Sequence, residues 1–367
     1  MATSALFSPA VELLLKDVNS RMALTPADDV NAFWHFVEQS EKIETHVHVE
    51  ASVSSAFYTE CFASEFWTGT APWLRAPFTD FRSFVLAWVD LTKCIRKVND
   101  LELLAENFVD RRASENIKYT EAYFSPADFS LLRSRFKVLP EVFELYEVMC
   151  AYVRGLKKGL EKNPGIEVRL ILDSFWPSTQ LEKRLMSEAL RKATSDELFF
   201  DDRGVPYIVA VGLGGAEQPE DIDTTVDFVN SLRSIGYKID IHSGEGGDPE
   251  FHKLHVGKLK PHRVSHGFSA MEHGWYFKDN LVMCPISNLL LKTFTGQPEG
   301  HPVFELLKRG DPIALGSDDP LLFGHSLTEE FAFLHAVERR ISESTFRKIQ
   351  ADTRASVLCP EVCERVF

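Results

Sequence analysis

Cysteine is scarce in this sequence, and long apolar runs are missing from it. Six cysteines are scattered over 367 residues, which is not the pattern of a disulfide framework. Only Cys359 and Cys363 lie close together, and their C-x3-C spacing differs from the paired C-x2-C of a structural zinc site. No stretch approaches the ~20 apolar residues that span a bilayer, and the first residues lack the basic and apolar regions of a secretion signal. We therefore expect a reduced, cytoplasmic protein.

Positive charge is also in short supply. The chain has 40 Lys and Arg against 54 Asp and Glu, a formal net charge of −14. This charge repels nucleic-acid backbones and anionic membrane surfaces, so we expect neither as a partner. The full signature of nucleic-acid deaminases, H-x-E followed by P-C-x-x-C, is missing as well, because the sequence has no P-C-x-x-C. With 44% apolar and 26% charged residues, the composition is that of a globular enzyme.

Short apolar runs, each followed by a longer segment, recur along the whole chain. Because several are apolar at nearly every position, they predict strands buried on both faces of a parallel sheet, connected by helices. The runs span residues 42–49, 117–125, 166–174, 206–214, 238–245, 262–268, 280–287 and 311–319. Eight β-then-α units without a linker favour an α/β fold, a (β/α)8 TIM barrel. From the pattern alone, a doubly wound sheet is the alternative.

The chain has more residues than a simple (β/α)8 barrel needs, and the additional residues lie in its N-terminal third. We interpret residues 1–41 as an N-terminal helical extension and residues 42–367 as a single metal-dependent barrel domain. Residues 50–116 are too long for one connection and predict inserted helices after the first strand. This insertion is rich in aromatic residues, which either wall a flat ligand as a lid or form a small separate core. The aromatic residues are Phe57, Tyr58, Phe62, Phe66, Trp67, Trp73, Phe78, Phe81, Phe84 and Trp88.

Polar residues gather at the ends of the predicted strands, where barrel enzymes place their active sites. His46 and His48 are spaced i, i+2, so on a strand both imidazoles lie on one face. His242 lies at the end of the fifth run and His266 at the end of the sixth. Asp318 and Asp319 end the eighth, where buried carboxylates need a compensating partner. Three imidazoles and one carboxylate suit zinc better than calcium or magnesium.

Seven motifs, taken together, resemble the adenosine/AMP deaminase family of the metal-dependent amidohydrolase superfamily. They occur in the family's order. They are KIETHVHV (42–49), YTEAYFSP (119–126), VGLGGAE (211–217), HSGE (242–245), RVSHG (263–267), CPISN (284–288) and SDDP (317–320). The resemblance implies a barrel that holds one Zn²⁺ per chain, although the ligand set also admits other divalent metals. By the same resemblance, the zinc ligands are His46, His48, His242 and Asp318.

The resemblance also implies roles for the neighbouring polar residues. Glu245 would protonate N1 of a purine, and His266 would orient the attacking water and stabilise the tetrahedral intermediate. Asp319 would act beside them and face N7 of the substrate. Gly215 would bring its main chain against N3, because glycine permits close approach to a flat ring. Glu50 stands where the family's aspartate meets the sugar, so we expect it to contact the group on N9.

The implied function is zinc-dependent hydrolytic deamination of a 6-aminopurine nucleoside, an adenosine-like substrate, to the 6-oxopurine and ammonia. Glu50 in place of aspartate, Gly212 and Ala216 in place of acidic residues, and Tyr123 in place of arginine depart from the family pattern. These changes leave open free adenine, AMP or an N6- or 5′-modified adenosine as the substrate. A catalytically silent nucleoside-binding or signalling relative is a further alternative. The sequence leaves the oligomeric state undetermined.

The other histidines and the cysteine of the CPISN motif are not expected to act. We expect Cys284 to pack rather than attack, since no activating partner follows from the sequence. We place four histidines in connecting segments that face solvent: His252, His255, His262 and His273. We also leave His301, His325 and His335 out of the site, as surface or helix-packing residues.

Overall fold

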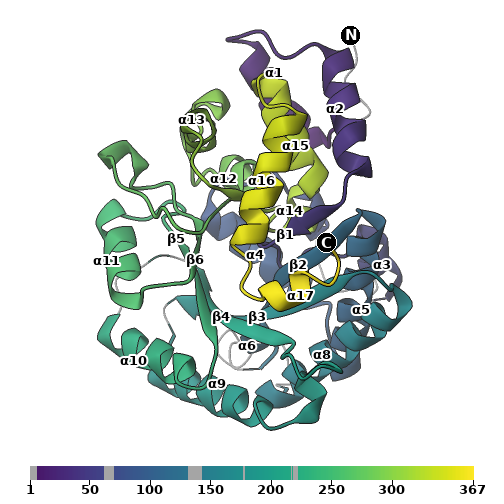
Figure 1. Ribbon diagram of the computed structural model, residues 1–367, viewed down its shortest axis with the longest axis vertical. Helices are drawn as coiled ribbons and strands as arrows, with labels where there is room; N and C mark the ends of the chain where they lie inside the picture. Colours follow the sequence, from purple (N-terminus) through teal and green to yellow (C-terminus); the bar gives the residue numbers. More distant parts are fainter. Residues whose placement is uncertain (1–5, 62–69, 131–142, 177, 216, 218–221) are drawn as a thin grey trace.

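Eight parallel strands in chain order form the centre of the molecule in this computed structural model (Figure 1). The structure describes residues 6–61, 70–130, 143–176, 178–215, 217 and 222–367. The strands are β1 (Lys42–Glu44), β2 (Ile117–Phe124), β3 (Glu167–Trp176), β4 (Ile208–Gly215), β5 (Lys238–Ser243), β6 (Arg263–His266), β7 (Leu281–Met283) and β8 (Ala314–Leu315). A bridge between Val47 and Asp318 joins the segments that follow β1 and β8, so the sheet closes into a (β/α)8 barrel, as predicted.

The strands form where the apolar runs predicted them, although all except β3 are shorter than predicted, and β1, β7 and β8 much shorter. β4 is buried along almost its whole length, as a strand covered on both faces must be. β1 and β8 have three and two residues, because the chain beyond them pairs only through single bridges. The run 280–287 was expected to be one strand, but helix α12 begins at Pro285. Proline lacks an N–H and favours the first helical turn, which explains why a helix begins at Pro285 and the strand ends before it.

Helices surround the barrel and link successive strands. Before β3 these are α1 (Pro9–Asn19), α2 (Ala27–Gln39), α3 (Ser55–Cys61), α4 (Phe81–Thr92), α5 (Val98–Ser114), α6 (Pro126–Phe129) and α8 (Leu145–Lys162). After it come α9 (Gln180–Ala193), α10 (Ile222–Arg233), α11 (Pro249–Leu259), α12 (Pro285–Leu290), α13 (Pro302–Arg309), α14 (Pro320–Phe323), α15 (Leu327–Val337), α16 (Glu343–Ala355) and α17 (Pro360–Cys363). Short 3-10 turns are η2 (Pro72–Leu74), η3 (Glu197–Phe199), η4 (Met271–His273) and η5 (Pro298–Gly300).

Helices from the beginning of the chain pack against helices from its last part on one side of the barrel. The purple helices α1 and α2 lie beside the yellow helices α15 and α16 in Figure 1. Val11 and Val18 of α1 and Val37 of α2 are fully buried, so the apolar faces of these amphipathic helices supply the contact. Within the described residues, no helix combines the length and apolar character that crossing a membrane requires.

A buried ionic network lies inside the barrel below the strand ends that carry the polar motifs. Arg263 on β6 donates from Nε to Asp240 Oδ2 at 2.8 Å and from Nη1 to Glu121. All three side chains are fully buried. Glu121 also accepts from the backbone N–H groups of Leu358 and Cys359, at 2.6 and 3.0 Å. The network therefore connects β2, β5 and β6 to the segment that precedes α17.

Candidate active site

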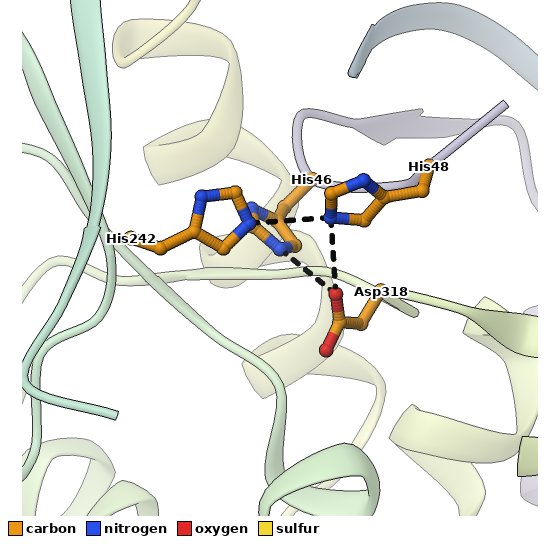
Figure 2. A group of neighbouring side chains, drawn as sticks. All are labelled: His46, His48, His242 and Asp318. Carbon is orange, nitrogen blue, oxygen red and sulfur yellow. Dashed lines mark hydrogen bonds and ion pairs between the residues drawn. The ribbon is translucent and has the colours of Figure 1, made fainter. Parts of the chain in front are cut away.

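Three histidines and one aspartate converge at the carboxyl end of the barrel. His46 and His48 follow β1, His242 lies on β5 and Asp318 follows β8, and all four side chains point toward one another (Figure 2). Asp318 Oδ1 lies 3.2 Å from His46 Nε2 and 3.5 Å from His48 Nε2, while the Nε2 atoms of His48 and His242 are 3.2 Å apart. Their ligand atoms all lie within 4.8 Å of one another, so the set can hold a metal ion.

The backbone at this end of the barrel is held in an uncommon conformation. Asp318 has a φ of 61° and His266 a φ of 68°, in the left-handed region that L-residues with bulky side chains seldom adopt. The bonds from Asp318 N to His46 O (3.2 Å) and from His48 N to Asp318 O (2.9 Å) hold the first of these turns. Such local strain is typical of functional sites, where the surrounding fold compensates for its cost.

The protonation states of the cluster suit metal ligation. Burial, followed by the neighbouring imidazoles, lowers the pKa of His46 and His48 well below the usual range, and burial lowers that of His242. Burial alone would raise the pKa of Asp318, but His266 and His48 lower it below its ordinary value. The cluster therefore presents neutral imidazoles and one carboxylate, which are the forms that bind a metal.

Glu245, His266 and Asp319 lie next to this cluster and are also buried. Glu245 Oε2 is 3.9 Å from His266 Nε2, and His266 Nδ1 lies 3.0 Å from the amide nitrogen of Asn288. Burial, then the charge of Asp318, raises the pKa of both Glu245 and Asp319 well above the ordinary range. Burial therefore favours the protonated form of Glu245 and Asp319 beside the ionised Asp318, an arrangement that can separate an acid role from a ligand role.

These polar groups and an aromatic wall line one cavity. Phe81, Phe84 and Trp88, all from α4, lie on its apolar side. The remaining lining residues are His48, Val85, Ser125, Asp173, Gly214, Gly215, His242, Glu245, His266, Leu291, Asp318 and Asp319. Tyr58 and Phe78 are instead buried in the main hydrophobic core, not in a separate one, and the contact of the wall with a flat ligand stays a prediction. Phe62, Phe66 and Trp67 lie outside the described residues.

Glu50 and Gly215 occupy different surroundings. Gly215 lines the cavity and has a φ of 104°, a conformation that glycine adopts without steric cost. Glu50 is fully buried and does not belong to the lining residues. Its Oε1 accepts a hydrogen bond from Ser125 N at 2.8 Å and another from the Tyr152 hydroxyl. The contact of Glu50 with a substrate thus stays a prediction.

Sequence reasoning missed three polar groups of the site. Ser287 Oγ donates to Asp318 Oδ2 at 2.5 Å, and Asn288 contacts His266, so the CPISN motif orients site residues. Asp173 ends the apolar part of β3 and lines the cavity. The one signal for Asp173 in the sequence was a carboxylate at the end of an apolar run.

One expectation about the other histidines was wrong. His252 and His255 were placed in solvent, but both are buried on α11, with 0% and 1% of their surface exposed. His252 Nδ1 lies 2.9 Å from Ser243 Oγ on β5, so helix packing against the barrel brings this residue inside. Cys284 is fully buried, and burial raises the pKa of its thiol well above the usual range, which fits a packing role.

Comparison with known proteins identifies the family. The model of the adenosine deaminase family matches residues 62–365, which is most of the chain. The chain belongs to the adenosine deaminase family. An adenine deaminase from Chelativorans sp. (strain BNC1) is 29% identical over 308 residues, covering 79% of this chain and 86% of the relative. This membership identifies the chain as a hydrolytic deaminase that acts on C–N bonds.

Two solved structures share the barrel of this adenosine deaminase family member. The N6-methyl-AMP deaminase from Arabidopsis thaliana superimposes with a TM-score of 0.70 at 20% identity, covering 91% of this chain and 96% of the other. A Burkholderia ambifaria amidohydrolase solved with bound zinc gives 0.70 at 17% identity, covering 92% and 90%. At these identities the similarity establishes the fold alone.

Proposed function

We propose that this chain catalyses the hydrolytic deamination of a 6-aminopurine: water adds at C6, the C6–N bond breaks, and the products are a 6-oxopurine and ammonia. The observation that carries the proposal is a cavity in which a metal-ligand set, a buried acid and an aromatic wall face one another. The adenine deaminase relative supports the purine substrate, with adenine itself as the preferred candidate.

Zinc is the metal that we propose for His46, His48, His242 and Asp318. The ligand set fits a cation because two neutral imidazole nitrogens face each other at 3.2 Å, a geometry that an ion between them would stabilise. Three nitrogens and one carboxylate oxygen suit zinc among the common divalent ions. When bound, such a cation supplies Lewis acidity that lowers the pKa of water toward ~7.

Glu245 is the proposed general acid. Its raised pKa favours the protonated form, which can deliver a proton to N1 as electrons move onto the ring during water addition. His266 lies beside Glu245 and is neutral, since burial lowers its pKa well below the usual range. Because Nδ1 accepts from the Asn288 amide, the neutral His266 ring carries its proton on Nε2, which can donate a hydrogen bond to the oxygen of the attacking water and so orient it. Asn288 at 3.0 Å holds the His266 ring in place.

Asp319 and Gly215 are the proposed positioning contacts for the purine ring. A protonated Asp319 can donate a hydrogen bond to N7, which is an acceptor. The Gly215 N–H can donate to N3 from the opposite side of the cavity. The aromatic rings of Phe84 and Trp88 offer a flat apolar surface to the base. Glu50, held by Tyr152, is proposed to act on the N9 side.

Ammonia release from a panel of substrates tests this function. Zinc-loaded protein is assayed with adenine, adenosine, 2′-deoxyadenosine, AMP and N6-methyl-AMP. Glu245→Gln, which keeps the size of the side chain, serves as the matched control. We expect release from at least one 6-aminopurine, and a loss of ~100- to 10,000-fold in the control, the usual contribution of a general acid. No release from any member by folded, metal-loaded protein would refute the proposal.

A further inference from the structure

Asp173 brings an unexplained carboxyl group into the cavity. It lies on β3, lines the cavity, and has 5% of its surface exposed. Its Oδ1 atom has no hydrogen-bond partner within the part of the chain that the structure describes. Buried polar atoms almost always have a partner, so an unpaired carboxyl oxygen on a residue that lines a cavity indicates a ligand group that would complete it.

The neighbouring strand leaves room for this carboxyl group. Asp173 pairs in register with Gly212 of β4. A Cβ added at Gly212 would lie 3.0 Å from Asp173 Oδ1, and one added at Gly214 would lie 3.0 Å from Oδ2. The family's aspartate on this strand is replaced by Gly212, and the carboxylate stands instead on the adjacent strand. A side chain on β4 and Asp173 could not occupy this space together.

The order of the strands around the barrel places Asp173 relative to the substrate. Around a purine, the nitrogens occur in the order N1, N3, N9 and N7. The proposed contacts follow the same order around the barrel, with Glu245 after β5, Gly215 on β4 and Asp319 after β8. The N9 edge then faces the arc formed by β3, β2 and β1. Asp173 on β3 is the carboxyl group that lines the cavity on this arc.

We propose that Asp173 is a specificity-determining residue that accepts a hydrogen bond from N9–H of a free 6-aminopurine base. This inference rests on the proposed function and narrows its substrate class. Either protonation form of a carboxyl group presents an acceptor oxygen, and N9–H is a donor only in the free base. In a nucleoside or nucleotide, carbon replaces that hydrogen, and Asp173 Oδ1 stays buried without a partner. Sites built around such a hydrogen bond reject analogues that lack the donor.

The test compares adenine with 9-methyladenine, which differ in the group on N9. We measure kcat/KM for both bases with the zinc-loaded wild type, Asp173→Ala and Asp173→Asn. The wild type is expected to prefer adenine at least tenfold, and Asp173→Ala should reduce that ratio by ~10- to 100-fold, chiefly through KM. Asp173→Asn should restore part of it, because its amide carbonyl can accept from N9–H. An unchanged ratio in Asp173→Ala would overturn the assignment.

A control variant and a binding measurement separate this assignment from the proposed chemistry. Ser174→Ala changes the next residue on β3, which does not line the cavity, and should leave the ratio at the wild-type value. Calorimetric titration of the two bases into Glu245→Gln, with and without Asp173→Ala, reports recognition without turnover. Adenine binding that depends on Asp173, with no ammonia release from any substrate, would support the assignment and refute the chemistry. Glu245-dependent release from nucleosides alone would support the chemistry and refute the assignment.

Discussion

Replacing Arg263 by methionine should destabilise the barrel beneath the site. The substitution keeps an unbranched chain of similar volume but leaves Glu121 and Asp240 buried without their common cation. Breaking a buried ion pair by removing one partner costs about 3–5 kcal/mol. Because two carboxylates lose their partner here, we expect the upper part of that range. With an unfolding entropy of ~2.1 cal/mol/K per residue over 367 residues, each kcal/mol shifts Tm by ~1.3 °C, so Tm should fall by about 6 °C.

Differential scanning calorimetry of the wild type and Arg263→Met measures this change. The matched control is Glu121→Gln/Asp240→Asn/Arg263→Met, in which no buried charge is left uncompensated, and it should recover at least half of the lost Tm. Arg263→Lys keeps the charge without the planar fork and should fall between the two. A fall of less than about 2 °C in Arg263→Met would refute the view that the ion pairs hold these strands together.

Three further predictions concern pH, metal and the aromatic wall. Burial lowers the pKa of His301 to about 3 in the folded chain, whereas the same imidazole takes up a proton near ~6.5 in the unfolded chain. The unfolded state therefore binds more protons, and the free energy of unfolding decreases as the pH falls from ~6.5 toward 3. His301→Asn can still accept the hydrogen bond from the Val303 N–H, and it should reduce the loss of unfolding free energy by up to ~1.4 kcal/mol per pH unit, measured by urea titration at several pH values. An unfolding free energy that depends on pH as steeply in His301→Asn as in the wild type would contradict this role of His301. Zinc at ~100 times its Kd should stabilise the wild type by about 2.7 kcal/mol, and an equal gain in His242→Ala would contradict the ligand set. Trp88→Ala should raise KM about tenfold with a smaller change in kcat, because an aromatic contact is worth ~1–3 kcal/mol, whereas Trp88→Phe keeps the ring and should stay near the wild type.

The barrel could be predicted because its strands are buried on both faces. Such strands are apolar at nearly every position, as in β4, so their number and order can be recognised without tertiary information. The cluster of His46, His48, His242 and Asp318 was predictable for a related reason: the carboxyl ends of parallel strands meet at one end of the barrel. Position at the strand ends brought the candidates together, and the resemblance to the family selected His242 and Asp318 from among them.

Contacts between distant segments could not be predicted in this way. His252 and His255 belong to a helix whose buried face is set by its packing on the barrel. The hydrogen bond from Tyr152 of α8 to Glu50 was not predicted, because nothing local in the sequence couples the two residues. The role proposed for Asp173 depends on the absence of side chains at Gly212 and Gly214, which becomes visible only when β3 and β4 are paired.

The most direct test of the proposed deamination follows the oxygen that enters the product. Zinc-loaded wild type and Glu245→Gln are incubated with adenine in ¹⁸O-labelled water, and ammonia and product mass are measured together. We predict that the wild type releases one ammonia for each 6-oxopurine that carries one ¹⁸O atom, and that Glu245→Gln forms at most about one hundredth as much. Product without the label, or equal amounts from both proteins, would contradict a hydrolysis that depends on Glu245.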